Sequence, residues 1–139
     1  MHMRGEPRTM QKNPVYTDLL SEVKSFLAER ARALTDLGVS AEKIVLDPGF
    51  GFGKTVSQNF ELLAKTEDFL SLGYPLLYGM SRKSSLGAVT GITKAEERLI
   101  SSVTAHLLAV ERGASIVRVH DVKQMKEALT IYKAMVHYK

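Results

Sequence analysis

Three short polar segments, each following an apolar run, contain side chains that could recognise a polar ring and a negatively charged group. They are residues 47–55 (DPGFGFGKT), 81–84 (SRKS) and 118–121 (RVHD). Asp47 carries a carboxylate that can accept two parallel hydrogen bonds from a guanidine-like ligand edge. The other two segments carry cations, and 81–84 comes just before a predicted helix N-terminus, whose free N–H groups favour anions.

The glycine-rich segment 47–55 matches neither of the two common nucleotide-binding motifs. A phosphate loop ending at residues 53–55 needs glycine where Pro48 stands, and a dinucleotide fingerprint needs glycine where Lys54 stands. What remains is a mobile glycine loop with two aromatic residues, directly after a carboxylate. Two interpretations stay open at this point: Asp47 caps a plain turn, or it accepts hydrogen bonds from a ligand.

The other two segments also have structural interpretations. Residues 81–84 could be a surface turn with a serine cap, and residues 118–120 could be a salt-bridged strand end. Strand alternation would put Arg118 and His120 on one face, at the mouth of the fold. His106 lies in an amphipathic helix, where we expect a structural role. We expect packing roles for the methionines at positions 1, 3 and 10. No metal-ligand spacing and no serine or cysteine nucleophile motif appears.

The elements that position these residues follow from hydrophobic periodicity. Strands are predicted at 44–46, 75–79 and 115–119, and helices at 16–37, 56–70, from 84 onward, 93–112 and from 121 onward. Thr93 and Glu96 predict a capping box for the fourth helix, and Asp121 predicts a cap for the last. Strand–helix alternation indicates an α/β fold with a parallel sheet, whose ligands bind at the carboxyl ends of the strands.

Composition is that of one globular domain, with 139 residues, 45% apolar and 24% charged. The net charge of +4 is spread along the chain, so we expect no nucleic-acid partner. No apolar run approaches the ~20 residues that span a bilayer, so we expect no membrane association. The absence of cysteine fits a reducing cytoplasm.

The first residues read as the end of a strand and its loop, with no strand before them. That gives three complete strands, whereas a closed barrel needs eight strands and ~250 residues. A sheet this small would leave an open parallel edge.

Four segments, in order, resemble the dihydropteroate synthase family. They are residues 1–11 (MHMRGEPRTMQ), 46–54 (LDPGFGFGK), 81–84 (SRKS) and 118–121 (RVHD). The resemblance covers the whole chain and implies a TIM (β/α)8 barrel. Residues 1–139 would form its C-terminal half, with these segments at the ends of about strands five to eight.

The family's roles carry over to matching positions. The resemblance implies pterin contacts from Asp47, Lys83 and Met1, with the carboxylate on the N3–H and 2-amino edge and the lysine on the O4/N5 side. It implies p-aminobenzoate contacts from Phe52 and Ser84. Arg118 and His120 would hold the diphosphate leaving group and, with Lys83, form the catalytic set.

In the implied reaction, p-aminobenzoate displaces diphosphate from a pterin diphosphate. A Mg²⁺ cofactor is expected, with its ligand residue in an N-terminal half that the chain lacks. We therefore expect little or no activity from this chain alone, and a homodimer in the full-length form. Two alternatives remain: the pterin-binding domain of a methyltetrahydrofolate methyltransferase, or a non-catalytic pterin-binding half-barrel that pairs with itself.

Overall fold

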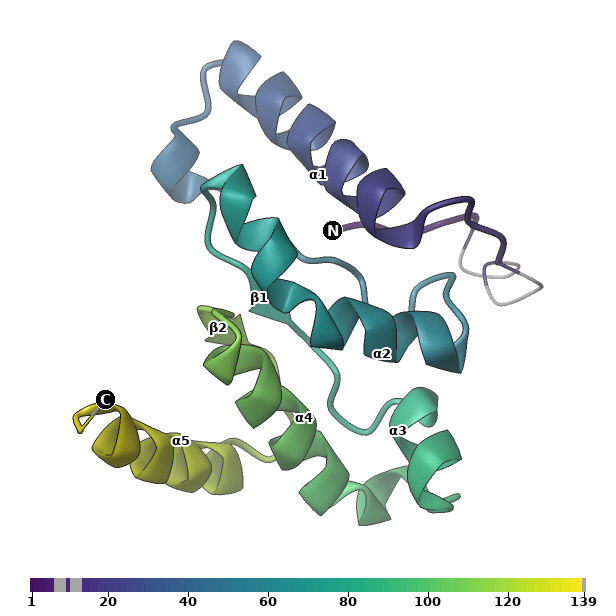
Figure 1. Ribbon diagram of the computed structural model, residues 1–139, viewed down its shortest axis with the longest axis vertical. Helices are drawn as coiled ribbons and strands as arrows, with labels where there is room; N and C mark the ends of the chain where they lie inside the picture. Colours follow the sequence, from purple (N-terminus) through teal and green to yellow (C-terminus); the bar gives the residue numbers. More distant parts are fainter. Residues whose placement is uncertain (7–9, 11–13, 139) are drawn as a thin grey trace.

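A computed structural model describes residues 1–6, 10 and 14–138 (Figure 1). In chain order the elements are α1 (Leu19–Asp36), the 3-10 helix η1 (Ala41–Lys43), α2 (Val56–Ala64), the 3-10 helix η2 (Thr66–Leu72), β1 (Leu77–Tyr78), α3 (Ser84–Thr90), the 3-10 helix η3 (Ala95–Glu97), α4 (Leu99–Glu111), β2 (Ile116–Val117) and α5 (Val122–Val136). The α/β class is confirmed. In the part described, no helix is both long and apolar enough to cross a membrane. Residues 7–9 and 11, which belong to the first segment of the resemblance, lie outside the described residues.

A small parallel sheet organises the chain. Leu77 and Tyr78 of β1 pair in parallel with Ile116 and Val117 of β2. On the other side of β1, Leu46 forms a parallel bridge with Leu76. Because all three segments run the same way, their carboxyl ends meet at one edge of the sheet.

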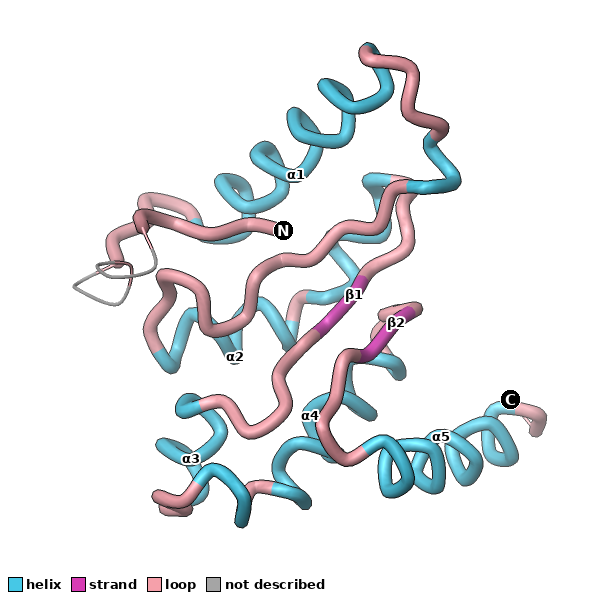
Figure 2. The backbone as a smooth tube through the Cα atoms, turned by 180° about the vertical axis from the view of Figure 1, so that it is seen from behind, coloured by secondary structure: helices cyan, strands magenta, loops and turns pink. Residues whose placement is uncertain are grey.

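The helices cover one face of this sheet. Seen from behind in Figure 2, β1 and β2 lie in front of α2 and α4, which are the nearer elements in Figure 1. Parallel strands need crossover connections, and each crossover here carries its helix onto the same side. The opposite face carries no helix in these views.

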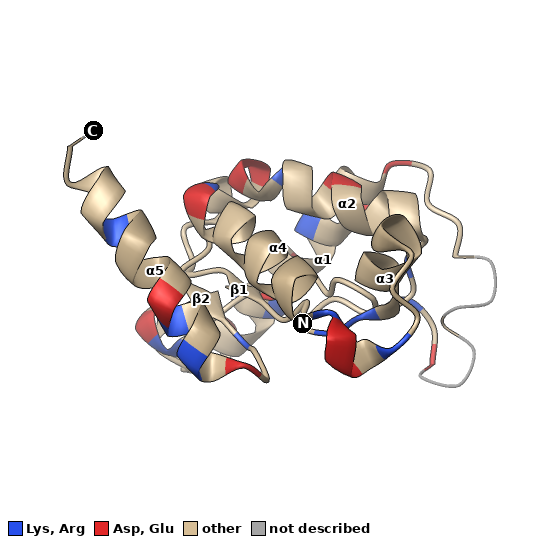
Figure 3. Ribbon diagram, turned by 90° about the horizontal axis from the view of Figure 1, so that it is seen from below, with Lys and Arg blue, Asp and Glu red and all other residues tan. Residues whose placement is uncertain are grey.

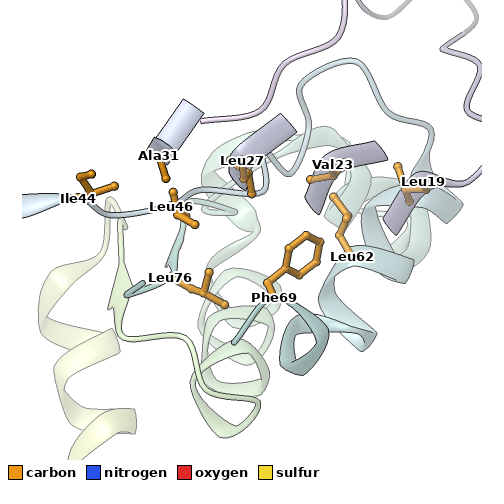
Figure 4. Close-up of a cluster of buried hydrophobic side chains, with 9 residues drawn as sticks. All are labelled: Leu19, Val23, Leu27, Ala31, Ile44, Leu46, Leu62, Phe69 and Leu76. Atoms are coloured by element: carbon orange, nitrogen blue, oxygen red, sulfur yellow. The ribbon is translucent and has the colours of Figure 1, made fainter. Parts of the chain in front are cut away.

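The main core lies under α1. Leu19, Val23, Leu27 and Ala31 recur at three- and four-residue spacing and are 5% exposed or less, which is the apolar stripe of an amphipathic helix. Figure 4 shows this stripe facing side chains from the sheet and from the α2–η2 region: Ile44, Leu46, Leu62, Phe69 and Leu76. Asp18 is the N-cap of this helix, and its carboxylate accepts a hydrogen bond from the Ser21 N–H at 3.0 Å.

The predicted strands are longer than the observed ones. The Ile44 N–H donates to the Ala41 carbonyl and closes the η1 turn, so only Leu46 of the predicted strand 44–46 pairs with the sheet. The predicted strand 115–119 is paired as β2 only at 116–117. The predicted helix 56–70 ends at Ala64 and continues as the tighter η2.

The predicted capping box at Thr93 and Glu96 is wrong. The helix α4 begins at Leu99, and its N-cap is Arg98 without a side-chain cap. The Arg98 guanidinium instead donates to the carbonyls of Ile92 and Thr93, at 2.9 and 2.5 Å. These bonds fold residues 92–98 around the arginine, so the helix cannot start at Thr93.

His106 has the structural role expected of it. Its Nε2 accepts the Met80 N–H at 2.9 Å and its Nδ1 lies 2.7 Å from the Ser102 carbonyl. The carbonyl can only accept, so the ring hydrogen is on Nδ1. Burial is the main cause that lowers the pKa of His106. This neutral ring ties α4 to the end of β1, just before the polar segment 81–84.

Charged residues of both signs share the surface. Figure 3 shows basic and acidic positions interspersed along α5 and elsewhere on the surface. This distribution agrees with the expectation that the chain does not bind nucleic acid, which stays a prediction.

Truncation of Leu62, which is fully buried, should lower the stability of the fold considerably. Leu62→Ala should lower the free energy of unfolding by about 2–5 kcal/mol, through lost burial and the cavity left behind. Leu37→Ala is the matched control, because Leu37 is 83% exposed and should change stability by less than about 0.5 kcal/mol. Urea unfolding followed by circular dichroism measures both; equal losses would contradict the assigned core.

Candidate ligand-binding site at the carboxyl edge of the sheet

The three chemically interesting segments meet at one edge of the sheet. Asp47 follows the Leu46 bridge, residues 79–83 follow β1, and residues 118–120 follow β2. The Arg118 N–H donates to the Tyr78 carbonyl at 2.9 Å, and the His2 N–H donates to the Asp47 carbonyl, also at 2.9 Å. The chain's first residues thus lie beside Asp47, as expected for the end of a strand and its loop.

The glycine loop needs glycine where it crosses the first residues of the chain. Gly49 and Gly53 have left-handed backbones, with φ of +76° and +67°. A β-carbon on Gly49 would lie 1.8 Å from the His2 carbonyl oxygen, and one on Gly53 would lie 2.4 Å from the Arg4 carbonyl oxygen. Only glycine allows both the conformation and the close approach.

Lys54 holds this loop closed from inside. Its side-chain nitrogen lies 2.8 Å from the Gly49 carbonyl, 3.1 Å from the Phe52 carbonyl and 3.0 Å from Nδ1 of His2. An ammonium group has three hydrogens, so these three acceptors use all of them. Lys54 is only 2% exposed, and burial lowers its pKa to about 7 while the Asp47 carboxylate opposes the shift.

His2 is suited to be one of these acceptors. Burial, helped by the charge of Lys54, lowers its pKa to about 4, so the ring is neutral at pH 7. Its edge also packs against Phe26 of α1, with ring centroids 5.0 Å apart. The loop is therefore fastened to the core through the lysine and the histidine.

Asp47 lies near three positive charges: Lys54, Lys83 and the amino group at the start of the chain. Its Oδ1 accepts the Gly49 N–H at 2.7 Å, so the turn-capping interpretation is correct. Each carboxylate oxygen has more than one acceptor site, so the cap leaves capacity for a ligand. Burial raises the pKa of Asp47, against the effects of the Gly49 N–H, Lys83, the chain's amino group and Lys54.

Lys83 packs against the glycine loop. Its ammonium donates to the Phe50 carbonyl and lies 4.4 Å from the centroid of the Phe52 ring. A β-carbon on Gly51 would come within 2.9 Å of the Lys83 side chain, so this glycine makes room for it. Burial lowers the pKa of Lys83 to about 8; Arg118 adds to the shift and Asp47 opposes it.

The predicted anion-binding residues lie next to this group. Arg118 is exposed and close enough to lower the pKa of Lys83. His120 is also exposed, and its Nδ1 lies 2.9 Å from the Ser81 hydroxyl. The same hydroxyl accepts the His120 backbone N–H at 3.3 Å. Ser81 therefore connects the segment after β1 to the segment after β2.

Three further predicted site residues, Phe52, Ser84 and Met1, lie at the margin of the site. Phe52 is half-buried beneath Lys83, Ser84 is exposed as the first residue of α3, and Met1 is 55% exposed. The structure thus brings together Asp47, Lys83 and Phe52, with Arg118 beside them, whereas Ser84 and Met1 make no contact that defines a pocket.

Several residues of the site were not predicted from the sequence. The sequence patterns assign no role to Lys54, and none of them points to Asn59. The Asn59 amide accepts the Gly51 N–H at 2.6 Å and donates to the Ser85 hydroxyl at 2.9 Å. Asn59 is 1% exposed, and it joins the glycine loop to α3. A polar residue among the apolar positions of helix 56–64 was the one available signal.

The chain is similar in sequence to proteins of a known family. The sequence pattern of the pterin binding enzymes matches residues 1–120, and the chain belongs to this family. The dihydropteroate synthase of Haemophilus influenzae is 43% identical over 134 residues, which make up 96% of this chain and 48% of that enzyme. The resemblance to dihydropteroate synthases is confirmed.

Solved structures of dihydropteroate synthases are also similar to this chain. The structure of Yersinia pestis dihydropteroate synthase with a sulfonamide drug superimposes with a TM-score of 0.96 at 40% identity, over 99% of this chain and 50% of that one. The Thermus thermophilus enzyme in complex with 6HMPPP has a TM-score of 0.92 at 42% identity, over 97% of this chain and 53% of that one. The complex of the same enzyme with 4-aminobenzoate has a TM-score of 0.89 at 42% identity, over 94% of this chain and 53% of that one. The chain spans about half the length of these relatives.

The buried position of Lys54 predicts a pH-dependent stability. The pKa of Lys54 is about 7 in the folded chain and has its ordinary value of 10.5 in the unfolded chain. Between these two pH values, the unfolded chain keeps the lysine proton and the folded chain loses it. The unfolded state then binds more protons, so the free energy of unfolding rises with pH over this range. Urea unfolding at pH 7, 8 and 9 should show this rise, and Lys54→Met should flatten it.

The matched control is Lys65→Met, at an exposed position just after α2. It should keep the wild-type slope. Burial of Lys83 contributes a similar rise above pH of about 8, so some slope remains in Lys54→Met. Identical slopes in Lys54→Met and wild type would contradict a buried, easily deprotonated lysine.

Proposed function

We propose that this chain forms the C-terminal half of the (β/α)8 barrel of a dihydropteroate synthase, at about strands five to eight. In this role it binds a pterin diphosphate and p-aminobenzoate. The observation that carries the proposal is the placement of a carboxylate, Asp47, and an ammonium, Lys83, after the carboxyl ends of neighbouring parallel segments, with Lys83 against the Phe52 ring. The complexes of the Thermus thermophilus relative with 6HMPPP and 4-aminobenzoate support the ligand classes.

The Asp47–Lys83 pair suits the two edges of a pterin. The carboxylate accepts from the ring N3–H and the 2-amino group, a bidentate geometry that favours planar guanidine-like partners. The ammonium donates to the O4/N5 side. In the free chain its hydrogen bond is with the Phe50 carbonyl, which a ligand would replace. Met1 is proposed to touch the pterin from its own loop.

The aromatic substrate would lie on the outer side of this pair. We assign the ring of p-aminobenzoate to Phe52 and its carboxylate to Ser84. Phe52 belongs to the loop that Lys54 closes, so its position depends on that buried ammonium.

The reaction forms one C–N bond and breaks one C–O bond. The p-aminobenzoate amine attacks the pterin methylene carbon, diphosphate leaves with the bonding electrons, and the amine loses a proton. Arg118 and His120 would stabilise the negative charge that develops on the diphosphate, and the Lys83 ammonium would add a positive charge beside that of Arg118. Preorganised charge of this kind is often the largest single contribution to catalysis.

The hydrogen bonding of His120 fits this role. Because the Ser81 hydroxyl already accepts the backbone N–H of His120, its own hydrogen is available to Nδ1. With Nδ1 as the acceptor of this bond, a ring hydrogen on Nε2, on the far side of the imidazole, would donate to a diphosphate oxygen.

Magnesium does not fit the residues of this site. In the described part of the chain, no three His, Cys, Asp or Glu side chains gather as a possible metal site. Asp47 has the cations Lys54 and Lys83 near it, whereas Mg²⁺ binds through carboxylates and phosphates. A Mg²⁺ ligand in an N-terminal half, a homodimer and a cytoplasmic location stay predictions from the sequence.

Pterin binding tests the proposed site. Titration of the chain with 6-hydroxymethylpterin, followed by ligand fluorescence, should give saturable binding. Asp47→Asn should weaken it about 10- to 100-fold, because charge-assisted hydrogen bonds are replaced by a neutral amide. Asp36→Asn, at an exposed position at the end of α1, is the control and should bind as wild type. Equal affinities for both variants would exclude Asp47 as the pterin carboxylate.

Turnover is a separate prediction. Because the chain spans about half the length of its relatives, we expect little or no dihydropteroate from the isolated chain supplied with the pterin diphosphate, p-aminobenzoate and Mg²⁺. Product would be measured chromatographically beside an Asp47→Ala sample. Turnover that Asp47→Ala abolishes would contradict this expectation and place a sufficient catalytic set within these 139 residues.

A further inference from the structure

Arg82, directly before Lys83, has an unusual backbone. Its φ is +61°, and it is the one non-glycine residue with positive φ in the described part of the chain. Left-handed backbone is unfavourable for a residue with a β-carbon and persists where surrounding contacts impose it. Such residues often occur at functional sites.

The contacts that impose it come from the start of α4. The Arg82 N–H donates to the Ser102 hydroxyl at 2.9 Å, and the Arg82 carbonyl accepts from the Arg98 guanidinium at 2.8 Å. Ser102 in turn donates to the Arg98 carbonyl at 2.6 Å. The Lys83 N–H closes the turn on the Met80 carbonyl at 3.1 Å. Both backbone groups of Arg82 are therefore fixed.

The Arg82 side chain points to the next strand end. Its Nη2 and Nε donate to the two carboxylate oxygens of Asp121, at 2.8 and 3.2 Å. This bidentate pair is directional as well as charged. Asp121 holds the N-cap position of α5 but makes no side-chain cap there, contrary to the prediction from the sequence. The carboxylate is engaged by Arg82 instead, which also lowers the pKa of Asp121.

The Arg82–Asp121 pair connects the segment after β1, residues 81–84, to the segment after β2, residues 118–121. Arg82 is bonded through the chain to Lys83, which faces Asp47, and Asp121 is bonded through the chain to His120. The Ser81–His120 contact at 2.9 Å is a second link between the same two segments. A shift of either segment would break directional bonds at both links.

We propose that Arg82 is a positioning residue: clamped by Ser102 and Arg98, and paired with Asp121, it sets the direction of Lys83 and fixes it relative to Arg118 and His120. The subsite for the pterin ring and the subsite for diphosphate are then held in one arrangement. The inference deepens the proposed function and rests on it for the identity of the two ligands.

A double-mutant cycle tests the proposal. Arg82→Met, Asp121→Asn and the double variant would be titrated with 6-hydroxymethylpterin and with inorganic diphosphate, and unfolded in urea. Neither residue is proposed to contact the pterin, yet each single variant should weaken pterin binding about tenfold, a coupling typical of one hydrogen-bonded network. The double variant should be no weaker than the poorer single variant.

The matched control is Glu97→Gln, which breaks the exposed ion pair between Lys94 and Glu97. It removes the same kind of charge without touching either segment, so its pterin affinity should equal that of wild type. A merely stabilising role for the Arg82–Asp121 pair would lower the urea midpoint but leave pterin affinity within twofold of wild type. That result, or losses that multiply in the double variant, would overturn the proposal.

Amide resonances separate this inference from the proposed function. In ¹H–¹⁵N spectra of the ligand-free chain, Asp121→Asn should shift the Lys83 amide, and Arg82→Met should shift the His120 amide. If wild type binds no pterin, the proposed function fails while these shifts still test the coupling of the two segments. If wild type binds pterin but neither amide moves, the positioning role fails alone.

Discussion

Parallel pairing of Leu46, β1 and β2 is the constraint on which the site depends. Strands that run the same way must be joined by crossovers, so their carboxyl ends share one edge although they are far apart in the sequence. Asp47, Lys83 and Arg118 follow successive members of this sheet. The backbone bond between the Arg118 N–H and the Tyr78 carbonyl fixes the register at that edge. A change in register would carry each of these side chains away from the others.

Desolvation governs the electrostatics at this edge. Burial is the leading cause of the lowered pKa values of Lys54 and Lys83 and of the raised pKa of Asp47. One carboxylate lies among several cations, so the group has excess positive charge. In the proposed function, the pterin diphosphate would relieve this repulsion through its negative charge. The glycine loop and the neutral ring of His2 keep water from Lys54, and this exclusion makes its charge costly.

Side chains that do not face the proposed ligands hold the loops of the site in place. Lys54 and Asn59 fasten the glycine loop, His106 fastens the end of β1, and Arg98 fastens the turn at Arg82. In each case a polar side chain bonds to backbone atoms of a loop, so the loop keeps one shape without regular structure of its own. Asn59 belongs to α2 and His106 to α4, and both helices cover one face of the sheet (Figure 2).

The sequence by itself determined the α/β class, the approximate position of most elements and the segments that carry chemistry. These follow from local rules: apolar periodicity, glycine and proline at turns, and polar residues after apolar runs. It also left two interpretations of Asp47 open, and the structure confirms that it caps a turn without excluding a ligand. Strand lengths were overestimated because pairing depends on partners elsewhere in the chain, as the η1 turn before Leu46 illustrates.

Tertiary structure alone decided which polar residues support the site. Thr93 and Glu96 satisfy a capping pattern, but the Arg98 side chain takes the Thr93 carbonyl and the helix starts later. Asp121 satisfies a cap position, but Arg82, distant in sequence, takes its carboxylate. The lysine at position 54 belongs to a motif that fails, yet it is the buried centre of the loop. Hydrogen-bond partners and burial depend on contacts between distant segments, and no local pattern records them.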